Sequence, residues 1–153
     1  MISSQVADGG MVRVREMTID DYDAVVEVWA RAGLPYRPFG RDAKDRIAIE
    51  LSGDSAIFLL AEEDGKIVGT ALCTHDGRKG WINRLAVDPE HQGKGTGALL
   101  VEEAERRFTA KGIKVFACQI MADNIGSQEF FSHLGYVPHD DVRYFSKRSD
   151  KDA

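Results

Sequence analysis

Residues 81–100 read WINRLAVDPEHQGKGTGALL, and this stretch decides the fold. It begins as an apolar strand, turns at Pro89, and passes through a glycine-rich loop into a helix. Gly93, Gly95 and Gly97 remove side chains where a ligand would approach the backbone, and the first N–H groups of a helix have no partner within it. The helix dipole adds positive potential at the same place. The stretch therefore predicts an anion site that suits a pyrophosphate.

The spacing of the glycines excludes two common phosphate-binding motifs. It matches neither Gly-x-Gly-x-x-Gly nor Gly-x-x-x-x-Gly-Lys-Ser/Thr, because no Lys-Ser or Lys-Thr pair ends the loop. The pattern present is Gln-x-x-Gly-x-Gly, from Gln92 to Gly97. Glycine turns before helices also serve chain geometry alone, so the glycines by themselves leave both interpretations open.

The composition is that of an ordinary globular protein. A chain of 153 residues can bury about two thirds of the surface that its unfolded form exposes. Hydrophobic residues make up 43% and charged residues 29%, and the net charge of −5 argues against a general nucleic-acid binder. We expect a flexible N-terminal tail over residues 1–10 and one domain over residues 11–149.

Cysteine usage and the absence of a secretion signal or a long apolar segment predict a cytoplasmic protein. Cys73 and Cys118 lie in apolar runs, so we expect two buried, reduced thiols. Residues 1–10 lack the features of a secretion signal, and no window approaches the roughly 18 apolar residues of a membrane helix. We expect no metal, no nucleic-acid partner and no membrane partner.

Hydrophobic periodicity predicts strands and helices in a mixed order. Thr18 and Asp21 form a short variant of the capping box before the first helix, which Gly33 and Pro35 end. The expected helices are residues 22–34, 43–51, 98–111 and 125–134. The expected strands are residues 11–17, 55–61, 67–74, 81–87 and 115–121, with a final pair through Tyr136 and Tyr144.

Three separate segments together resemble one family. LAVDPEH precedes the glycine loop, and DNIGSQEFFSHLGY follows it at residues 123–136. With the Gln-x-x-Gly-x-Gly loop between them, the chain resembles the GNAT superfamily of acetyl-CoA-dependent N-acetyltransferases, from Val12 to about Ser146. It is most similar to the small single-domain bacterial members. The resemblance implies an α/β (α+β) fold with a mixed, splayed, twisted sheet of about six to seven strands, flanked by about four helices.

The resemblance also implies which residues hold acetyl-CoA, the cosubstrate. The backbone of the loop would hold the pyrophosphate, and the strand before it would pair its free edge with the pantetheine arm. Asn124 would contact CoA, although a plain N-cap role for its helix is an equal alternative. The implied cofactor-binding residues are Leu85, Ala86, Val87, Gln92, Gly93, Lys94, Gly95, Thr96, Gly97, Asn124 and Phe131.

Two departures from the family pattern leave the proton-transfer groups unknown. Phe131 stands where many members have a Tyr acid, and Gln119 stands where some have a Glu base. Neither side chain transfers a proton at neutral pH. The acceptor is then either an amine of low pKa, or an amine deprotonated through ordered water by another residue. The catalytic candidates are Asn83, Gln119 and Tyr144, with His75 and Asp76 as further bases for a water relay.

An acceptor site is expected between the first two helices. Its residues would be Tyr36, Arg37, Phe39 and Arg41, together with Trp81 and Asn83, which share one strand face. Solvated surface arginines are the ordinary alternative. The sequence predicts acetyl transfer to a primary amine of a small molecule, peptide or protein. A CoA-binding sensor with little turnover and an unrelated nucleotide binder stay open, as does the homodimer that is common in the family.

Overall fold

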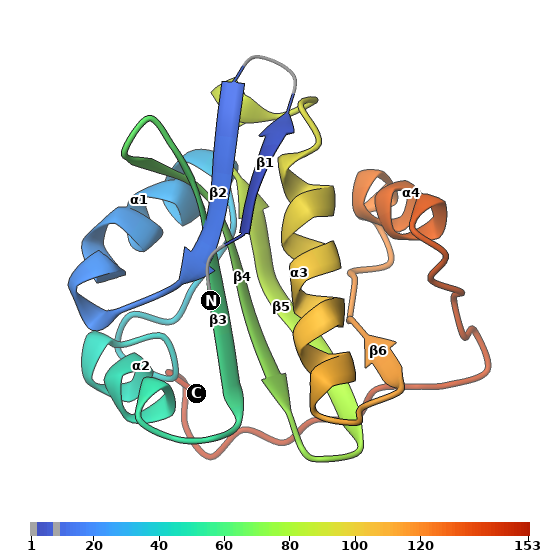
Figure 1. The fold of residues 1–153 in the computed structure, drawn as a ribbon. Helices are drawn as coiled ribbons and strands as arrows, with labels where there is room; N and C mark the ends of the chain where they lie inside the picture. The colour runs from blue at the N-terminus through green and yellow to red at the C-terminus, as the bar shows by residue number, and fades with distance from the viewer. Residues whose placement is uncertain (1–2, 8–9) are drawn as a thin grey trace.

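The sheet is built around β3 (Ala56–Glu63) and β4 (Lys66–His75), whose residues are buried along most of their length. The computed structural model describes residues 3–7 and 10–153. Within them the sheet has six strands in sequence order, at the lower end of the expected number. The others are β1 (Ser3–Ala7), β2 (Gly10–Glu16), β5 (Lys79–Val87) and β6 (Val115–Ala117). Neighbours are antiparallel except β5 and β6, which run parallel, so the predicted mixed sheet is confirmed (Figure 1).

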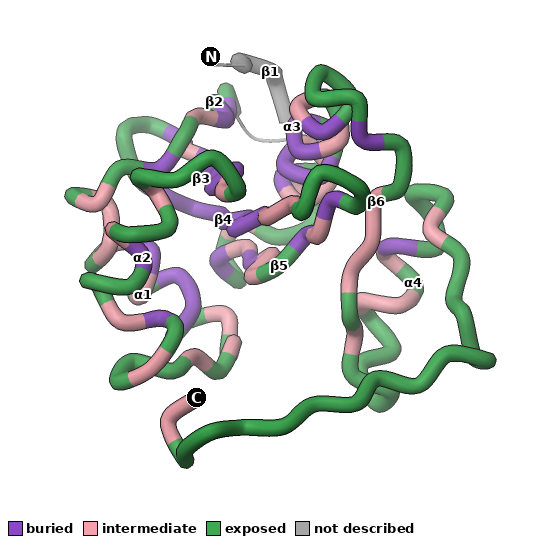
Figure 2. The backbone as a smooth tube through the Cα atoms, turned by 90° about the horizontal axis from the view of Figure 1, so that it is seen from below, coloured by how far each residue is buried: buried purple, intermediate pink, exposed green. Residues whose placement is uncertain are grey.

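Helices cover both faces of this sheet. α1 (Tyr22–Ala32) and α2 (Lys44–Leu51) pack on one face, and α3 (Thr96–Ala110) packs on the other (Figure 1). A hydrophobic core lies between the sheet and the helices on each face. Alternate residues of β3 pack in one core or the other, because successive strand side chains point to opposite faces. Leu59 packs in the core with α3, and Leu60 packs in the core with α1. The buried residues therefore lie along both sides of the central strands (Figure 2).

The predicted helix boundaries follow from local signals. The N–H of Thr18 donates to the Asp21 carboxylate at 2.8 Å, within a capping box that begins the short helix η1 (Ile19–Asp21). Gly33 ends α1 in the left-handed conformation, with φ of 72°. A last helix, α4 (Ile125–His133), lies beside α3 (Figure 1). The four α-helices that were predicted are confirmed.

β5 and β6 separate after three residues of pairing. Lys79 pairs with Val115, Gly80 with Phe116, and Trp81 with Ala117, and no pairing continues beyond them in the described residues. The predicted strand over residues 115–121 is therefore too long. Its later residues leave the sheet because β5 no longer lies beside them, and α4 stands apart from β5 (Figure 1).

Both ends of the chain differ from expectation. The predicted final strands are wrong, since residues 136–153 contain no strand and Tyr144 is 70% exposed. Ser3–Ala7, expected in a flexible tail, instead pair with β2. Gly10, the last residue of that predicted tail, begins β2, and residues 1–2 and 8–9 lie outside the described residues. Among those described, no helix has the length and apolar character needed to cross a membrane.

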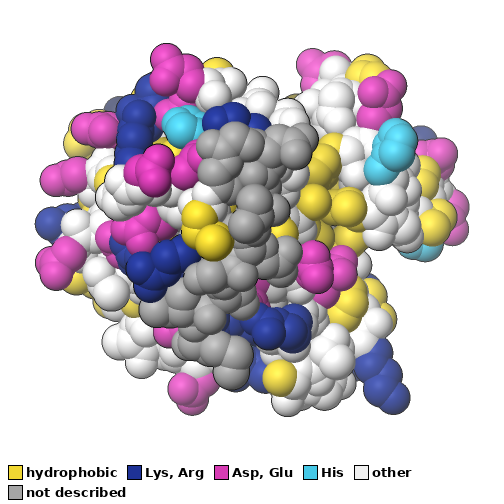
Figure 3. All heavy atoms as spheres, turned by 45° about the horizontal axis from the view of Figure 1, so that its top comes forward, with side chains coloured by type: hydrophobic (Ala, Val, Ile, Leu, Met, Phe, Trp, Pro, Cys, Tyr) yellow, Lys and Arg dark blue, Asp and Glu magenta, His cyan; other side chains and the backbone are white. Residues whose placement is uncertain are grey.

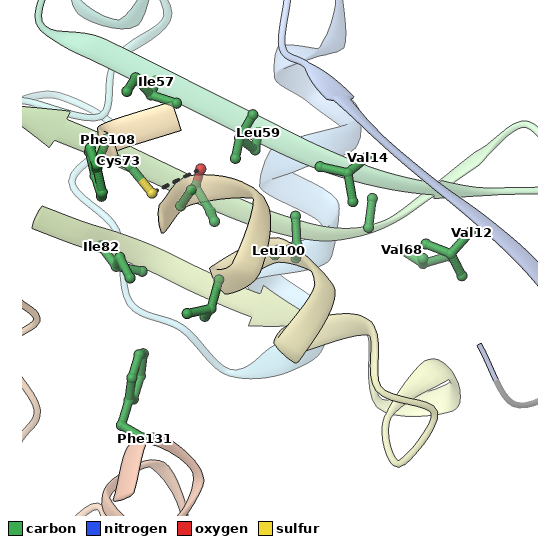
Figure 4. Close-up of a cluster of buried hydrophobic side chains, with 14 of the residues drawn as sticks. Val12, Val14, Ile57, Leu59, Val68, Cys73, Ile82, Leu100, Phe108 and Phe131 are labelled. Carbon is green, nitrogen blue, oxygen red and sulfur yellow. Dashed lines mark hydrogen bonds between the residues drawn. The ribbon is translucent and has the colours of Figure 1, made fainter. Parts of the chain in front are cut away.

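The two cysteines are free thiols, as predicted. Burial raises the pKa of Cys73 to about 12 and that of Cys118 to about 11. Cys73 is fully buried in the core with α3, where its thiol donates weakly to the carbonyl of Ala71 (Figure 4). Cys118 is only partly buried.

Candidate active site

The glycine loop adopts backbone conformations that suit glycine. Gly93 has φ of 77° and Gly95 has φ of 84°, and an added Cβ at either position would meet no atom within 4 Å. Glycine is therefore favoured there by the positive φ and not by a lack of space for a side chain. Gly95 is also the N-cap of α3, so the loop ends where the helix begins.

The N–H groups of this loop are available to a ligand. Within the described residues, the backbone N–H groups of Gly93, Lys94 and Gly95 donate to no backbone carbonyl of the loops and turns. The first turn of α3 contains no acidic residue that would oppose an anion. Helix N-terminal N–H groups and the helix dipole together favour a negatively charged group. The residues present therefore fit a pyrophosphate, and Lys94 adds a cation to the same loop.

Gly97 lies in the first turn of α3, on the side that faces α4. A Cβ added there would approach Cζ of Phe130 to 3.2 Å and Cγ2 of Val87 to 3.8 Å. Phe130, which the sequence analysis did not single out, thus faces the first turn of α3. In the space-filling view α4 forms a lobe apart from the main body, with hydrophobic side chains along the recess between them (Figure 3).

The strand before the loop has one unpaired edge. Ala86 pairs with Thr70 and Val87 with Gly69 on the β4 side. On the other side, β6 reaches no farther than Trp81 in the described residues. An extended ligand with amide groups could pair with this edge, as the family resemblance implied for Leu85, Ala86 and Val87. Gln92 Nε2 donates to the Val87 carbonyl at 3.0 Å and so ties the loop to the end of the strand.

Two buried carboxylates anchor the start of the loop. Asp88 is 1% exposed, accepts from the N–H of Glu90 at 3.1 Å, and pairs with Arg31 of α1 at 2.6 Å. It caps the short helix η2 (Pro89–His91). At the end of η2, Nδ1 of His91 lies 2.7 Å from the Glu63 carboxylate of β3. These contacts fix the position of the loop relative to α1 and the sheet.

The residues predicted on α4 occupy different environments. The side-chain oxygen of Asn124 accepts from the N–H of Ser127 at 3.1 Å, so the N-cap role is confirmed. Phe131 is 6% exposed and points from α4 into the core, where its ring packs edge-on against Phe130 and Tyr136 (Figure 4). The Tyr136 hydroxyl donates to the Glu105 carboxylate at 2.6 Å. Burial and that carboxylate raise the pKa of Tyr136, so it is a poor proton donor.

The candidate proton-transfer residues do not form a cluster. Gln119 is exposed beyond the end of β6, and Tyr144 lies in the strandless C-terminal segment. Asp76 accepts from the N–H groups of Arg78 and Lys79 in a turn, and these hydrogen bonds lower its pKa. His75 Nε2 lies 2.9 Å from the carbonyl of Asp54, and its Nδ1 is buried without a partner in the described residues.

β5 carries a bulge beside the predicted acceptor residues. Two steps along β4, from Thr70 to Leu72, correspond to three steps along β5, from Ala86 to Asn83. One extra residue therefore lies in β5, and Arg84 there has φ of 51°. A non-glycine residue in that conformation costs about 1–2 kcal/mol. The sequence analysis treated residues 81–87 as one regular strand and did not predict this bulge.

A buried chain of hydrogen bonds holds the bulge in place. Trp29 Nε1 of α1 donates to the Thr70 hydroxyl at 3.1 Å, and that hydroxyl donates to the Arg84 carbonyl at 2.7 Å. Trp29 and Thr70 are both fully buried. The Arg84 guanidinium lies over the Trp29 ring, 5.1 Å from its centroid. Burial lowers the pKa of Arg84, and the neighbouring Asp42 carboxylate opposes that shift.

The segment between α1 and α2 contacts the same arginine. The Arg84 guanidinium pairs with Asp42 and donates to the Pro35 carbonyl. Tyr36 is half-buried and packs on Trp29, with 5.6 Å between ring centroids. The predicted acceptor residues Phe39 and Arg41 are exposed, and Phe39 is 86% exposed. Asn83 is also exposed, and its Nδ2 donates to the Thr74 hydroxyl at 3.3 Å.

Comparison with known proteins identifies the family of this chain. The model of the Acetyltransferase (GNAT) family matches residues 14–136. The curated protein Acetyltransferase SG1711 of Sodalis glossinidius (strain morsitans) is 29% identical over 141 residues, covering 92% of this chain and 98% of its own length.

Two solved structures share the fold. PaiA N-acetyltransferase from Thermoplasma acidophilum, in complex with coenzyme A, has a TM-score of 0.74 at 23% identity, covering 84% of this chain and 91% of its own. The aminoglycoside acetyltransferase meta-AAC0020, from an uncultured soil metagenomic sample and in complex with sisomicin, has a TM-score of 0.76 at 17% identity, covering 91% and 97%. With the family model matching most of its length, this chain belongs to the acetyltransferase (GNAT) family of acetyl-CoA-dependent N-acetyltransferases.

Proposed function

We propose that this acetyltransferase transfers the acetyl group of acetyl-CoA to a primary amine of low pKa. The observation that carries the proposal is the unpaired edge of β5, which leads directly into the loop with left-handed Gly93 and Gly95 at the start of α3. The loop N–H groups and Lys94 would hold the pyrophosphate, and the edge of Leu85, Ala86 and Val87 would align the pantetheine amides. When bound, acetyl-CoA supplies a thioester that a neutral amine attacks directly.

The preference for an amine of low pKa follows from the side chains beside the bulge. Asp42 is the buried carboxylate there, but the Arg84 guanidinium and the N–H of Arg37 already donate to its Oδ2. Asn83 and Trp81 are not bases. A lysine-type amine of pKa about 10.4 is neutral in about one molecule of 2,500 at pH 7, whereas an α-amine of pKa about 8 is neutral in about one of ten. Without a protein base, the α-amine is favoured.

The first experiment separates the acetyltransferase from other classes of protein. Thermal unfolding is measured with CoA, ATP and NAD, and acetyl-CoA consumption is measured with a polyamine, an aminoglycoside and a peptide with a free N-terminal alanine. We expect stabilisation by CoA alone and turnover with at least one amine. Stabilisation by CoA without any turnover would support a CoA-binding sensor. Stabilisation by ATP or NAD but not by CoA would overturn the assignment of the loop.

A second experiment tests the preference for low pKa. The pH dependence of kcat/KM is measured with peptides whose acceptor is either an α-amine or a lysine side chain. We expect the ascending limb to follow the pKa of the amine in each peptide. If the midpoint of the ascending limb of kcat/KM lies at the same pH for both peptides, and the limb disappears in His75→Gln, a protein base exists.

A further inference from the structure

We propose that Arg84 is a positioning residue that clamps the acceptor side of the protein to the bulged strand β5. The inference rests on the proposed acetyl transfer, because it takes residues 35–42, between α1 and α2, as one side of the acceptor site. We call these residues the wall, and the contacts of the Arg84 guanidinium with them the clamp. Arg84 lies 42 residues or more from the groups that it holds on that segment. Its guanidinium therefore joins two parts of the chain that no local signal brings together.

The Arg84 guanidinium contacts three groups of the protein. One amino group pairs with Asp42, and the other donates to the Pro35 carbonyl. The face of the guanidinium lies over Trp29. The Arg84 and Asp42 side chains are only 14% and 7% exposed, so solvent screens their attraction weakly. A planar fork with two donor directions makes this set of contacts, whereas a lysine ammonium lacks its plane and its second arm.

Asp42 transmits the clamp to the rest of the segment. Its carboxylate also accepts from the N–H of Arg37 at 2.7 Å, and its carbonyl accepts from the Tyr22 hydroxyl of α1 at 2.7 Å. Residues 35–42 are thus held at both ends by one buried carboxylate and one guanidinium. Tyr36 lies between these ends and packs on Trp29. The segment is therefore held in one position against Arg84 and Trp29 rather than being a free loop.

The backbone of Arg84 is fixed independently of its guanidinium. Its carbonyl accepts from Thr70, which in turn accepts from Trp29. Its positive φ is a strained conformation of the kind that persists where the surroundings determine it, often at functional sites. The same residue therefore lies in the bulge of β5 and holds residues 35–42 through its side chain. Changing the side chain should disturb the wall and leave the strand in place.

The test combines hydrogen exchange with steady-state kinetics on the full chain. In Arg84→Gln and in Asp42→Asn, we expect amide exchange across residues 35–43 to accelerate about tenfold or more, with β4 and α3 unchanged. With the amine that turns over fastest in the panel above, we expect KM for the amine to rise about tenfold. KM for acetyl-CoA should change less than about twofold. Arg84→Lys should give intermediate values.

The matched control is Arg15→Gln, which breaks another partly buried ion pair, between Arg15 and Asp21 at 2.9 Å. It should leave exchange in residues 35–43 and both KM values unchanged. Unchanged exchange in Arg84→Gln would overturn the proposal, as would an equal rise of both KM values or the same effect in the control. If the wild type acetylates no amine of the panel, the proposed function fails. The hydrogen-exchange measurement still decides whether Arg84 holds residues 35–42 in place.

Discussion

Replacing Gly95 by glutamate should separate the binding role of the loop from its role in chain geometry. The positive φ of 84° imposes a strain of about 1–2 kcal/mol on any side chain. No atom lies within 4 Å of an added Cβ, so crowding adds nothing. A carboxylate at the start of α3 recovers about 0.3–1 kcal/mol from the helix dipole. We therefore expect the variant to fold, with a free energy of unfolding lower by about 1 kcal/mol.

The effect of Gly95→Glu on CoA affinity should be larger than its effect on stability. Two like unit charges about 5 Å apart repel by about 1–3 kcal/mol at an effective dielectric constant between that of water and about 20. That free energy corresponds to a weakening of about 5- to 140-fold in Kd. Gly95→Gln is the matched control, because it carries the same strain and nearly the same volume without the charge.

Isothermal titration calorimetry can measure CoA binding to the wild type and both variants at low and high salt. We expect Gly95→Glu to lose most affinity at low salt and to recover part of it at high salt, since salt screens exposed charges. Gly95→Gln should stay closer to the wild type at both. Pantetheine, which lacks the phosphates, should not distinguish glutamate from glutamine. If Gly95→Glu binds CoA within twofold of Gly95→Gln at low salt, the pyrophosphate assignment is wrong.

Three further outcomes test the fold around the site. Gly80→Ala places a Cβ about 2.6 Å from the ring of Phe108, so urea denaturation should show a loss of about 1–3 kcal/mol; an unchanged midpoint would contradict that packing. The hydrogen bond from Arg15 lowers the pKa of Asp21 below its usual 3.8, so the stability this pair gives is complete above that value and is lost as pH falls through the folded pKa. The difference in Tm between wild type and Asp21→Asn should therefore shrink on acidification, and a constant difference would refute the link. Because burial raises the pKa of Cys73 to about 12, a thiol reagent at pH 8 should modify it only after unfolding, and rapid modification of the native protein would argue against its burial.

Sequence reasoning was most accurate where neighbouring residues decide the structure. The capping box of Thr18 and Asp21 and the end of α1 at Gly33 follow from preferences that act within a few residues. α3 begins at Thr96, before the predicted start at residue 98. Sequence reasoning was wrong for the final pair of strands, because a strand needs a partner and residues 136–153 have none in the described structure. The strand through residues 115–121 was too long for the same reason.

The chemistry of α4 shows the same division. The sequence placed Phe131 where a proton donor is common, and the structure adds that this ring is buried in the core. Its neighbour Phe130 faces Gly97 instead, which only the position of α4 relative to α3 could decide. Tyr136 is bound to Glu105, a residue 31 positions away, so its unsuitability as an acid also depends on tertiary contacts.

The sequence by itself determined the family resemblance and the conformation of the anion loop, because glycine φ preferences and unpaired helix N–H groups are local properties. The family resemblance implied that the sheet splays, and tertiary structure alone decided that β5 leaves β6 beyond Trp81 and that β5 carries a bulge at Arg84. It also decided the pairing of Arg84 with Asp42, since strand pairing and buried ion pairs depend on which distant segments pack together.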